Sequence, residues 1–277
     1  MSAPVPLRLR PLEVGDLLDE TFRMYRRHFV LFAGISVILS IPAAALSGYT
    51  YYSFLTAFIQ QASTGQPLDL SRFGSTIGAL AVGFLINLAL VPFLYGAVTY
   101  AACESALGHQ VTAWGVVRGV LRRYFQLGGY VILIALMAIL FCLLPLWIWI
   151  WVGWAVVMPV MFIENTGLIA AMGRSWRLVE GHWWRTFLII FLIFILVYVA
   201  RLALGGFILL GQILLQIILS SVAASWIFAA ATAVIDALVT PIFQIAVVLI
   251  YFDLRVRREG LDLFQLAQRL PAPQPTA

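Results

Sequence analysis

The chain has 277 residues, of which 63% are hydrophobic and only 10% carry a charged side chain. Since an average soluble domain has about a quarter charged residues, this composition excludes an ordinary soluble enzyme or binding domain. The formal net charge is +5, and all 17 basic residues are arginine. Several uncharged runs are long enough for the helix of about 20 residues that crosses a bilayer. The sequence therefore predicts an all-α integral membrane protein.

The uncharged runs predict six transmembrane helices within one polytopic domain, residues 1–270. The expected spans are about 30–56, 76–104, 125–143, 146–163, 185–204 and 226–252. The run 125–163 would make roughly 58 Å of helix, nearly twice the hydrocarbon thickness, so we expect it to fold back at Pro145. Segment 207–222 is expected to be an outer-leaflet or re-entrant helix, with inclusion in a longer helix left open. The proline-rich residues 271–277 are expected to be a disordered tail.

Arginine is concentrated before the first span, after the second, after the fourth and after the last. By the positive-inside rule, these four groups belong in the cytoplasm, which requires an even number of spans. The region before Val30 contains acids as well as arginines, unlike the short basic start of a cleaved signal peptide. We therefore expect a multi-pass protein of the bacterial inner (cell) membrane with both termini in the cytoplasm.

Three segments share one plan, which predicts three repeats of an interfacial helix plus a transmembrane hairpin. The interfacial helices are expected at about 11–28, 111–123 and 167–181. In the first, Val14, Leu18, Phe22, Tyr25 and Phe29 recur at about four residues and make one apolar face. The arginines beside these helices should attract anionic lipid headgroups, at about 1 kcal/mol each near the surface. Membrane lipids are thus the expected partners, and a protein partner is left open.

Two charges fall inside predicted spans, where each costs at least about 2.5 kcal/mol on insertion scales. Arg201 and Asp236 should lie at similar depth, roughly 22 to 26 Å from the inner boundary at 1.5 Å per residue. We expect an ion pair that joins the fifth span to the sixth. The alternative is a polar cavity or ion path lined by these two residues.

A second set of charged residues ends the spans on the inner side. We expect these residues to form a cytoplasmic ionic cluster: Glu104, Glu164, Arg174, Asp253 and Arg255. The first interpretation is a structural clasp between the three units. The second is a site for a lipid headgroup or a protein partner.

No residue pattern predicts catalysis. The histidines His28, His109 and His182 lack a second metal ligand three or four residues away, and both cysteines, Cys103 and Cys142, lie in apolar runs. No phosphate-binding loop, nucleophile elbow or dinucleotide fingerprint occurs. We expect no catalytic, metal or cofactor site and no nucleic-acid partner.

Three stretches carry a resemblance to a known family. Tyr251–Asp262, with the sequence YFDLRVRREGLD, resembles the closing signature of the bacterial membrane-domain family named after glycerophosphoryl diester phosphodiesterases. Glu164 followed by Gly173–Val179, and the opening Arg10–Arg27, agree with it. The resemblance implies a bacterial inner-membrane protein. In the proteins that named the family this region is joined to a separate hydrolytic barrel, whose histidine and acid motif is absent from the sequence here.

Three hypotheses about function follow. The first is a non-enzymatic membrane protein that organises lipids or protein partners through its arginine-rich cytoplasmic face. The second is a transporter or lipid flippase that uses Arg201 and Asp236, since transporters often combine repeats with polar sites at mid-membrane. The third, a phosphodiesterase acting alone, has no catalytic residues to support it.

Overall fold

A computed structural model describes residues 12–42, 44, 48, 70–137, 143–218 and 221–260. Within these ranges no strand occurs, which confirms the all-α prediction. The helices are α1 (Val14–Arg27), the Phe29–Pro42 helix, α3 (Leu70–Ala106), α4 (Ala113–Met137), α5 (Leu144–Gly153), α6 (Val157–Ile163), α7 (Leu168–Val179), α8 (Trp183–Ile218) and α9 (Ser221–Glu259).

Five helical segments are long and apolar enough to cross a membrane: Leu80–Ala106, Ala113–Met137, Leu144–Ile163, Trp183–Gly211 and Trp226–Glu259. α1 and the Phe29–Pro42 helix, which meet at a bend of 77°, add a sixth candidate if they are counted together. The protein is therefore a multi-pass membrane protein with five to six candidate spans. The second half of predicted span 30–56 and the tail 271–277 lie outside the described residues.

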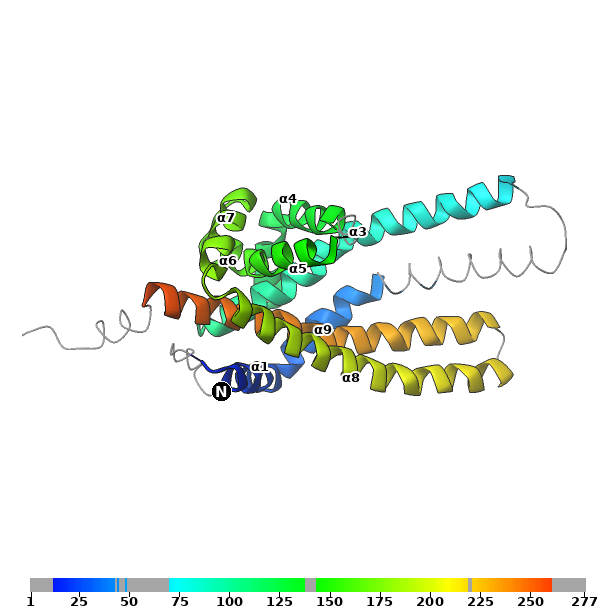
Figure 1. Cartoon of the computed structure of the whole chain (residues 1–277). Helices are drawn as coiled ribbons and strands as arrows, with labels where there is room; N and C mark the ends of the chain where they lie inside the picture. The colour runs from blue at the N-terminus through cyan, green and yellow to red at the C-terminus, as the bar shows by residue number, and fades with distance from the viewer. Residues whose placement is uncertain are drawn as a thin grey trace, which may run out of the picture.

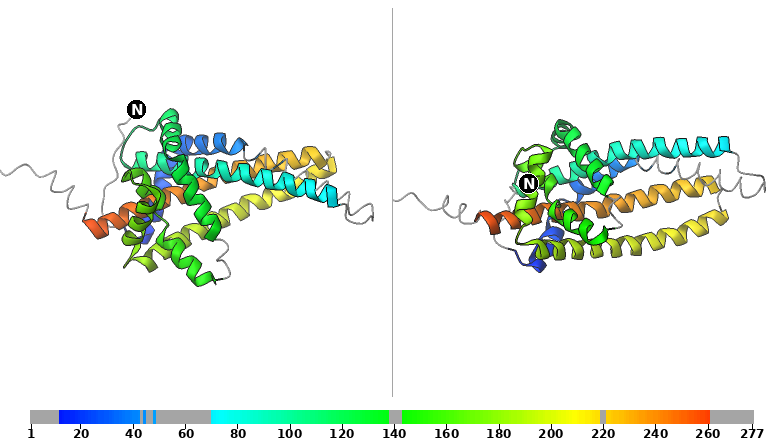
Figure 2. Two further views of the ribbon diagram at one scale, coloured as in Figure 1. Left: turned by 90° about the horizontal axis from the view of Figure 1, so that it is seen from above. Right: turned by 45° about the horizontal axis from the view of Figure 1, so that its top comes forward.

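The long helices and the short helices occupy different parts of the molecule. α3, α8 and α9 extend away from a head that contains α1 and α4 to α7 (Figure 1). Seen from above, the hairpin of α4 and α5 lies across the long helices instead of running alongside them (Figure 2). We call the end that carries α1, the first part of α4, α7, the start of α8 and the last part of α9 the arginine-rich end.

Segment 207–222 forms no separate outer-leaflet or re-entrant helix, and the alternative of inclusion in longer helices holds. α8 continues to Ile218 and α9 begins at Ser221, so the described residues of the segment belong to two long helices. Gly205 and Gly206 do not break α8, because hydrocarbon offers no other partner for the backbone amides and carbonyls. The apolar part of α8, 29 residues, would be about 43 Å long, so it must tilt to fit a hydrocarbon core of about 30 Å.

The segment 111–123 also differs from its prediction as a separate interfacial helix. It forms the first part of α4, which continues without a break to Met137. α1 and α7, by contrast, end in turns, and the turn after α7 uses Gly181 with φ of +79°. The corner near Arg123 contains neither proline nor a glycine in the left-handed region, so nothing ends the helix there. The second unit is therefore built differently from the first and third.

The predicted span 146–163 is divided between α5 and α6. Pro159 has no N–H to donate to the carbonyl four residues earlier, and its ring crowds that carbonyl, which explains the break. Side chains from neighbouring helices satisfy the carbonyls near it. Ser175 donates to the carbonyl of Gly153 at 2.8 Å, and Tyr130 donates to that of Trp154 at 3.0 Å. The break is thus part of the packing of α4, α5 and α7.

Two prolines inside the long helices have tyrosine partners. Tyr25 of α1 donates to the carbonyl of Leu238, three residues before Pro241, at 2.7 Å. Tyr124 of α4 donates to the carbonyl three residues before Pro92, at 2.9 Å. A proline weakens the helical hydrogen bonds around it, and in hydrocarbon the affected carbonyls need other donors. These tyrosines therefore attach the head to the long helices.

Removing the Tyr25 hydroxyl tests this attachment. Tyr25 is 8% exposed, so Tyr25→Phe removes the side-chain hydrogen bond to the Leu238 carbonyl and should lower the free energy of unfolding by about 1 kcal/mol. Unfolding in mixtures of dodecyl sulfate and a mild detergent measures the change. Tyr198→Phe, at an exposed tyrosine of α8, is the matched control and should have no effect. Equal stability of the two variants would count against the role of Tyr25.

Candidate functional site

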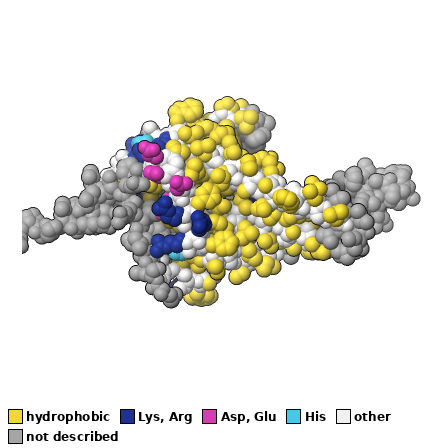
Figure 3. All heavy atoms as spheres, turned by 90° about the horizontal axis from the view of Figure 1, so that it is seen from below, with side chains coloured by type: hydrophobic (Ala, Val, Ile, Leu, Met, Phe, Trp, Pro, Cys, Tyr) yellow, Lys and Arg dark blue, Asp and Glu magenta, His cyan; other side chains and the backbone are white. Residues whose placement is uncertain are grey.

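The charged side chains gather at the arginine-rich end, and apolar side chains cover the rest of the face drawn in Figure 3. The described arginines at this end fall into two groups. One group forms ion pairs and hydrogen bonds that join helices. The other has no such partner among the described residues.

The first joining cluster is centred on Asp253 near the end of α9, whose side chain is 2% exposed. Its carboxylate accepts hydrogen bonds from Arg185 of α8 at 3.2 Å and from Arg257 at 3.0 Å. It also accepts the backbone N–H of Leu12 at 3.0 Å, and both arginines donate to the Leu12 carbonyl. This clasp ties the segment before α1 to α8 and α9.

The second joining cluster holds α7 against α9. Arg174 pairs with Glu164 at 3.0 Å and with Glu259, and Arg255 pairs with Glu259 at 2.9 Å. The Tyr251 hydroxyl donates to Glu164 at 3.0 Å and accepts from Arg255 at 3.2 Å. Burial lowers the pKa of Arg174, but the hydrogen bonds to Glu259 and Glu164 raise it above its ordinary value. The cluster therefore holds fixed, fully paired charges.

The five residues predicted to form one ionic cluster lie in three places. Glu164, Arg174 and Arg255 come together, while Asp253 belongs to the other clasp. Glu104 instead pairs with the exposed His109 at 2.8 Å, just beyond α3. The shared inner-side position was visible in the sequence, but the neighbours of each residue depend on how the helix ends are arranged.

Arg201 of α8 and Asp236 of α9 form an ion pair at 2.8 Å. The side chains are 42% and 57% exposed, so the pair lies on the side of the α8–α9 hairpin. Arg201 also contacts the Thr240 hydroxyl at 3.4 Å. Within the described residues, the pair joins two neighbouring long helices, as the sequence predicts.

Several joining residues were missed by sequence reasoning, although a signal was present. Polar residues on α9 repeat at intervals of four in two groups: Asp236, Thr240 and Gln244, then Tyr251, Arg255 and Glu259. Residues four apart lie on one face of a helix, so the repeat marks where α9 meets polar partners. No such signal marks Arg185 or the backbone of Leu12 as partners of Asp253.

Five exposed arginines form no ion pair or hydrogen bond with any described residue: Arg26, Arg27, Arg118, Arg122 and Arg177. They lie in the last turn of α1, the first half of α4 and the last turn of α7. Large apolar side chains near them are also exposed, among them Trp114 at 74% and Phe125 at 90%. Unpaired arginines beside exposed aromatic rings are typical of a surface in contact with lipid headgroups.

A pocket of about 340 Å³ opens between α3, α4, the α5–α6 region and α9. Its lining residues are Val91, Tyr95, Tyr130, Val131, Ile134, Trp151, Ala155, Met158, Phe243, Gln244 and Val247. Across the described part of the chain, no group of three histidine, cysteine or acidic side chains is arranged to hold a metal ion.

In comparisons with known proteins, no family model, curated protein or solved structure matches the chain.

Proposed function

We propose that this protein is a non-enzymatic membrane protein that gathers anionic lipids at its arginine-rich end. The observation that carries the proposal is the division of the arginines into a paired and an unpaired group. The paired group forms the ion pairs of the two joining clusters and consists of Arg174, Arg185, Arg255 and Arg257. The five unpaired arginines are not needed for those contacts, so their charge is available to ligands.

The positions of the unpaired arginines favour lipid phosphates over other anions. Arg26 and Arg27 end an amphipathic helix, and Arg118 and Arg122 lie near the exposed rings of Trp114 and Phe125. An aromatic ring at the headgroup level fixes the depth of the helix in the interface, so that a nearby guanidinium reaches phosphate oxygens. Each arginine near an anionic surface contributes about 1 kcal/mol.

The test replaces the five unpaired arginines by glutamine. In nanodiscs of mixed phosphatidylglycerol and phosphatidylcholine, the wild-type protein should enrich phosphatidylglycerol around itself, and the variant should lose that preference. Native mass spectrometry of retained lipids and energy transfer to labelled lipids both measure it. The loss should be roughly 1 kcal/mol for each arginine removed, and added salt should reduce the wild-type preference.

Two control variants define the outcome. Replacing the same five arginines by lysine keeps the charge and should keep most of the enrichment. Arg23→Gln removes an arginine that already pairs with Glu20 at 3.3 Å and should change little. If the glutamine variant enriches phosphatidylglycerol as well as the wild type does, the proposal fails.

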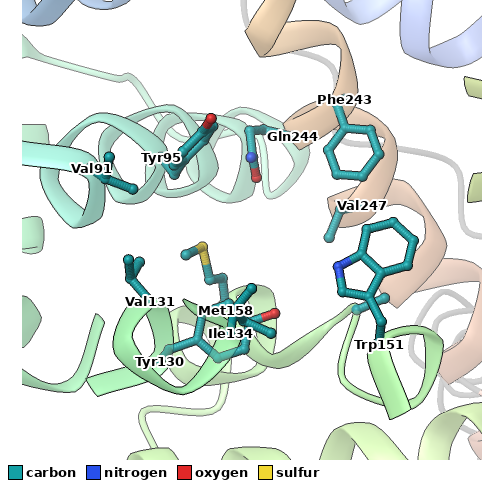
Figure 4. Close-up of a pocket in the computed structure, with 11 residues that line it drawn as sticks. Val91, Tyr95, Tyr130, Val131, Ile134, Trp151, Met158, Phe243, Gln244 and Val247 are labelled. Atoms are coloured by element: carbon teal, nitrogen blue, oxygen red, sulfur yellow. The ribbon is translucent and has the colours of Figure 1, made fainter. Parts of the chain in front are cut away.

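A second candidate is a transporter or lipid flippase. It is supported by a polar stripe on α9 that leads from Asp236 through Thr240 to Gln244 at the pocket. Tyr95 of α3 lies beside Gln244 on the same wall of the pocket (Figure 4). A dithionite assay of fluorescent lipid movement in proteoliposomes separates the two candidates, because a lipid-gathering protein leaves the rate of movement at the background level.

We also propose that the chain belongs to the membrane-domain family that its motifs resemble, in a bacterial inner membrane with both ends in the cytoplasm. Contacts between the three motif segments support the assignment. Leu12 of the opening segment contacts Asp253 of the closing one, and Glu164 contacts Tyr251. Labelling of single introduced cysteines with a membrane-impermeant reagent tests the orientation.

A further inference from the structure

We propose that the pocket between α3, α4 and α9 holds one acyl chain of a phospholipid from the leaflet next to the arginine-rich end. The proposal concerns a site on the side of the bundle and does not rest on the unpaired arginines. Three features of the pocket support it: its position along the long helices, its partly exposed lining and the placement of its polar side chains.

The depth of the pocket matches one leaflet. At 1.5 Å per residue, Gln244 lies roughly 10 Å from Tyr251 along α9, and Tyr95 lies roughly 14 Å from Glu104 along α3. Val91 lies roughly 20 Å from Glu104 along α3. Since half of the hydrocarbon core is about 15 Å thick, the pocket extends from within the leaflet next to the arginine-rich end to about the bilayer centre.

The pocket is open along its side. Of its eleven lining residues only Met158, Gln244 and Val247 are buried, and the other eight are partly exposed. A neighbouring lipid could therefore enter from the bilayer without passing through the protein.

The polar groups of the pocket lie on the side nearer to the arginine-rich end. The Tyr95 hydroxyl forms no hydrogen bond with a described residue. The Gln244 oxygen accepts from Thr99 at 3.0 Å, while its amide nitrogen has no partner in the described part of the chain. Figure 4 shows Tyr95 and Gln244 on one wall and Tyr130 on the opposite wall. Two free donors on this side of the pocket suit an ester carbonyl.

The far end of the pocket suits the acyl chain itself. Val91 and Ile134 offer only hydrocarbon surface there. Water is disfavoured as the occupant, because an ordered water needs two to four polar partners and this end provides none. The pocket volume lies at the small end of the roughly 300–1,000 Å³ of ligand pockets, which fits part of one chain better than a whole lipid.

The experiment uses the full chain in phosphatidylcholine nanodiscs that contain a small fraction of phosphatidylcholine with a diazirine in one acyl chain. After photolysis, mass spectrometry of peptides should place the label on pocket residues of α3 and α4 above the level at exposed α8 residues. The probe is zwitterionic, so failure of the arginine proposal would leave this result unchanged.

Two substitutions act on the pocket alone. Ala155→Leu fills it and should remove most of the labelling, while Ala203→Leu, on the exposed side of α8, should not. Tyr95→Phe removes the free hydroxyl and should lower labelling by roughly threefold to tenfold, as expected for one lost hydrogen bond. Tyr198→Phe is the control. Thermal unfolding confirms that each variant is folded.

Label spread evenly over lipid-facing residues, unchanged by Ala155→Leu, would mean ordinary boundary lipid only and would overturn the proposal. Equal labelling of Tyr95→Phe and the wild type would overturn the assignment of the ester to Tyr95. Strong pocket labelling by a water-soluble carbene reagent in place of the lipid would identify a wet cavity, which also contradicts it.

Discussion

Asp253→Ala should lower the free energy of unfolding by about 3–5 kcal/mol, because it leaves two partly buried arginines without their carboxylate. Arg185 and Arg257 would then face each other, and the backbone N–H of Leu12 would lose its acceptor. The buried thiol of Cys103 reports unfolding through a thiol-reactive dye, in a Cys142→Ser background. The same dye, with titration by dodecyl sulfate, gives the free energy.

The control for this prediction is Asp19→Ala, which removes an exposed carboxylate from α1 and should change stability by no more than about 0.5 kcal/mol. Arg185→Gln should destabilise less than Asp253→Ala, since Arg257 still pairs with the carboxylate. A loss below about 1 kcal/mol for Asp253→Ala would show that the cluster does not clasp the helices, given the usual cost of an unpaired buried charge.

The second large effect is expected at the ion pair between Arg201 and Asp236. Arg201→Asp or Asp236→Arg alone places two like charges together within the hydrocarbon and should cost at least about 2.5 kcal/mol. The double variant exchanges the charges and should recover most of that loss. A double-mutant cycle, measured by the same detergent titration, gives the interaction energy of the pair.

The cycle has a clear negative outcome and a nearby control. If the losses of the two single variants simply add in the double variant, the residues do not stabilise each other. Thr240→Val removes only the contact of 3.4 Å to Arg201, so it should cost less than about 1 kcal/mol. A large effect of Thr240→Val would mean that Arg201 is stabilised mainly by its contact with Thr240 and not by the ion pair with Asp236.

The sequence by itself determined the class of this protein. Its hydrophobic runs require helices in a bilayer, and the cost of an isolated charge in lipid predicts that Arg201 finds Asp236. The spacing of arginine along the chain also marked one charged end. These conclusions follow from local composition and from the length of a span, so no knowledge of helix packing was needed.

Only the tertiary structure decided which partners meet and where helices break. The sequence places Glu104, Glu164 and Asp253 at the same inner side of the membrane. Helix packing gives each of them a different partner: His109, Arg174 and Arg185. Segment 207–222 carries glycine and glutamine as a re-entrant helix would, yet its described residues belong to two long helices. The physical reason is that a backbone in hydrocarbon keeps its own hydrogen bonds, while side-chain partners depend on the arrangement of all the helices.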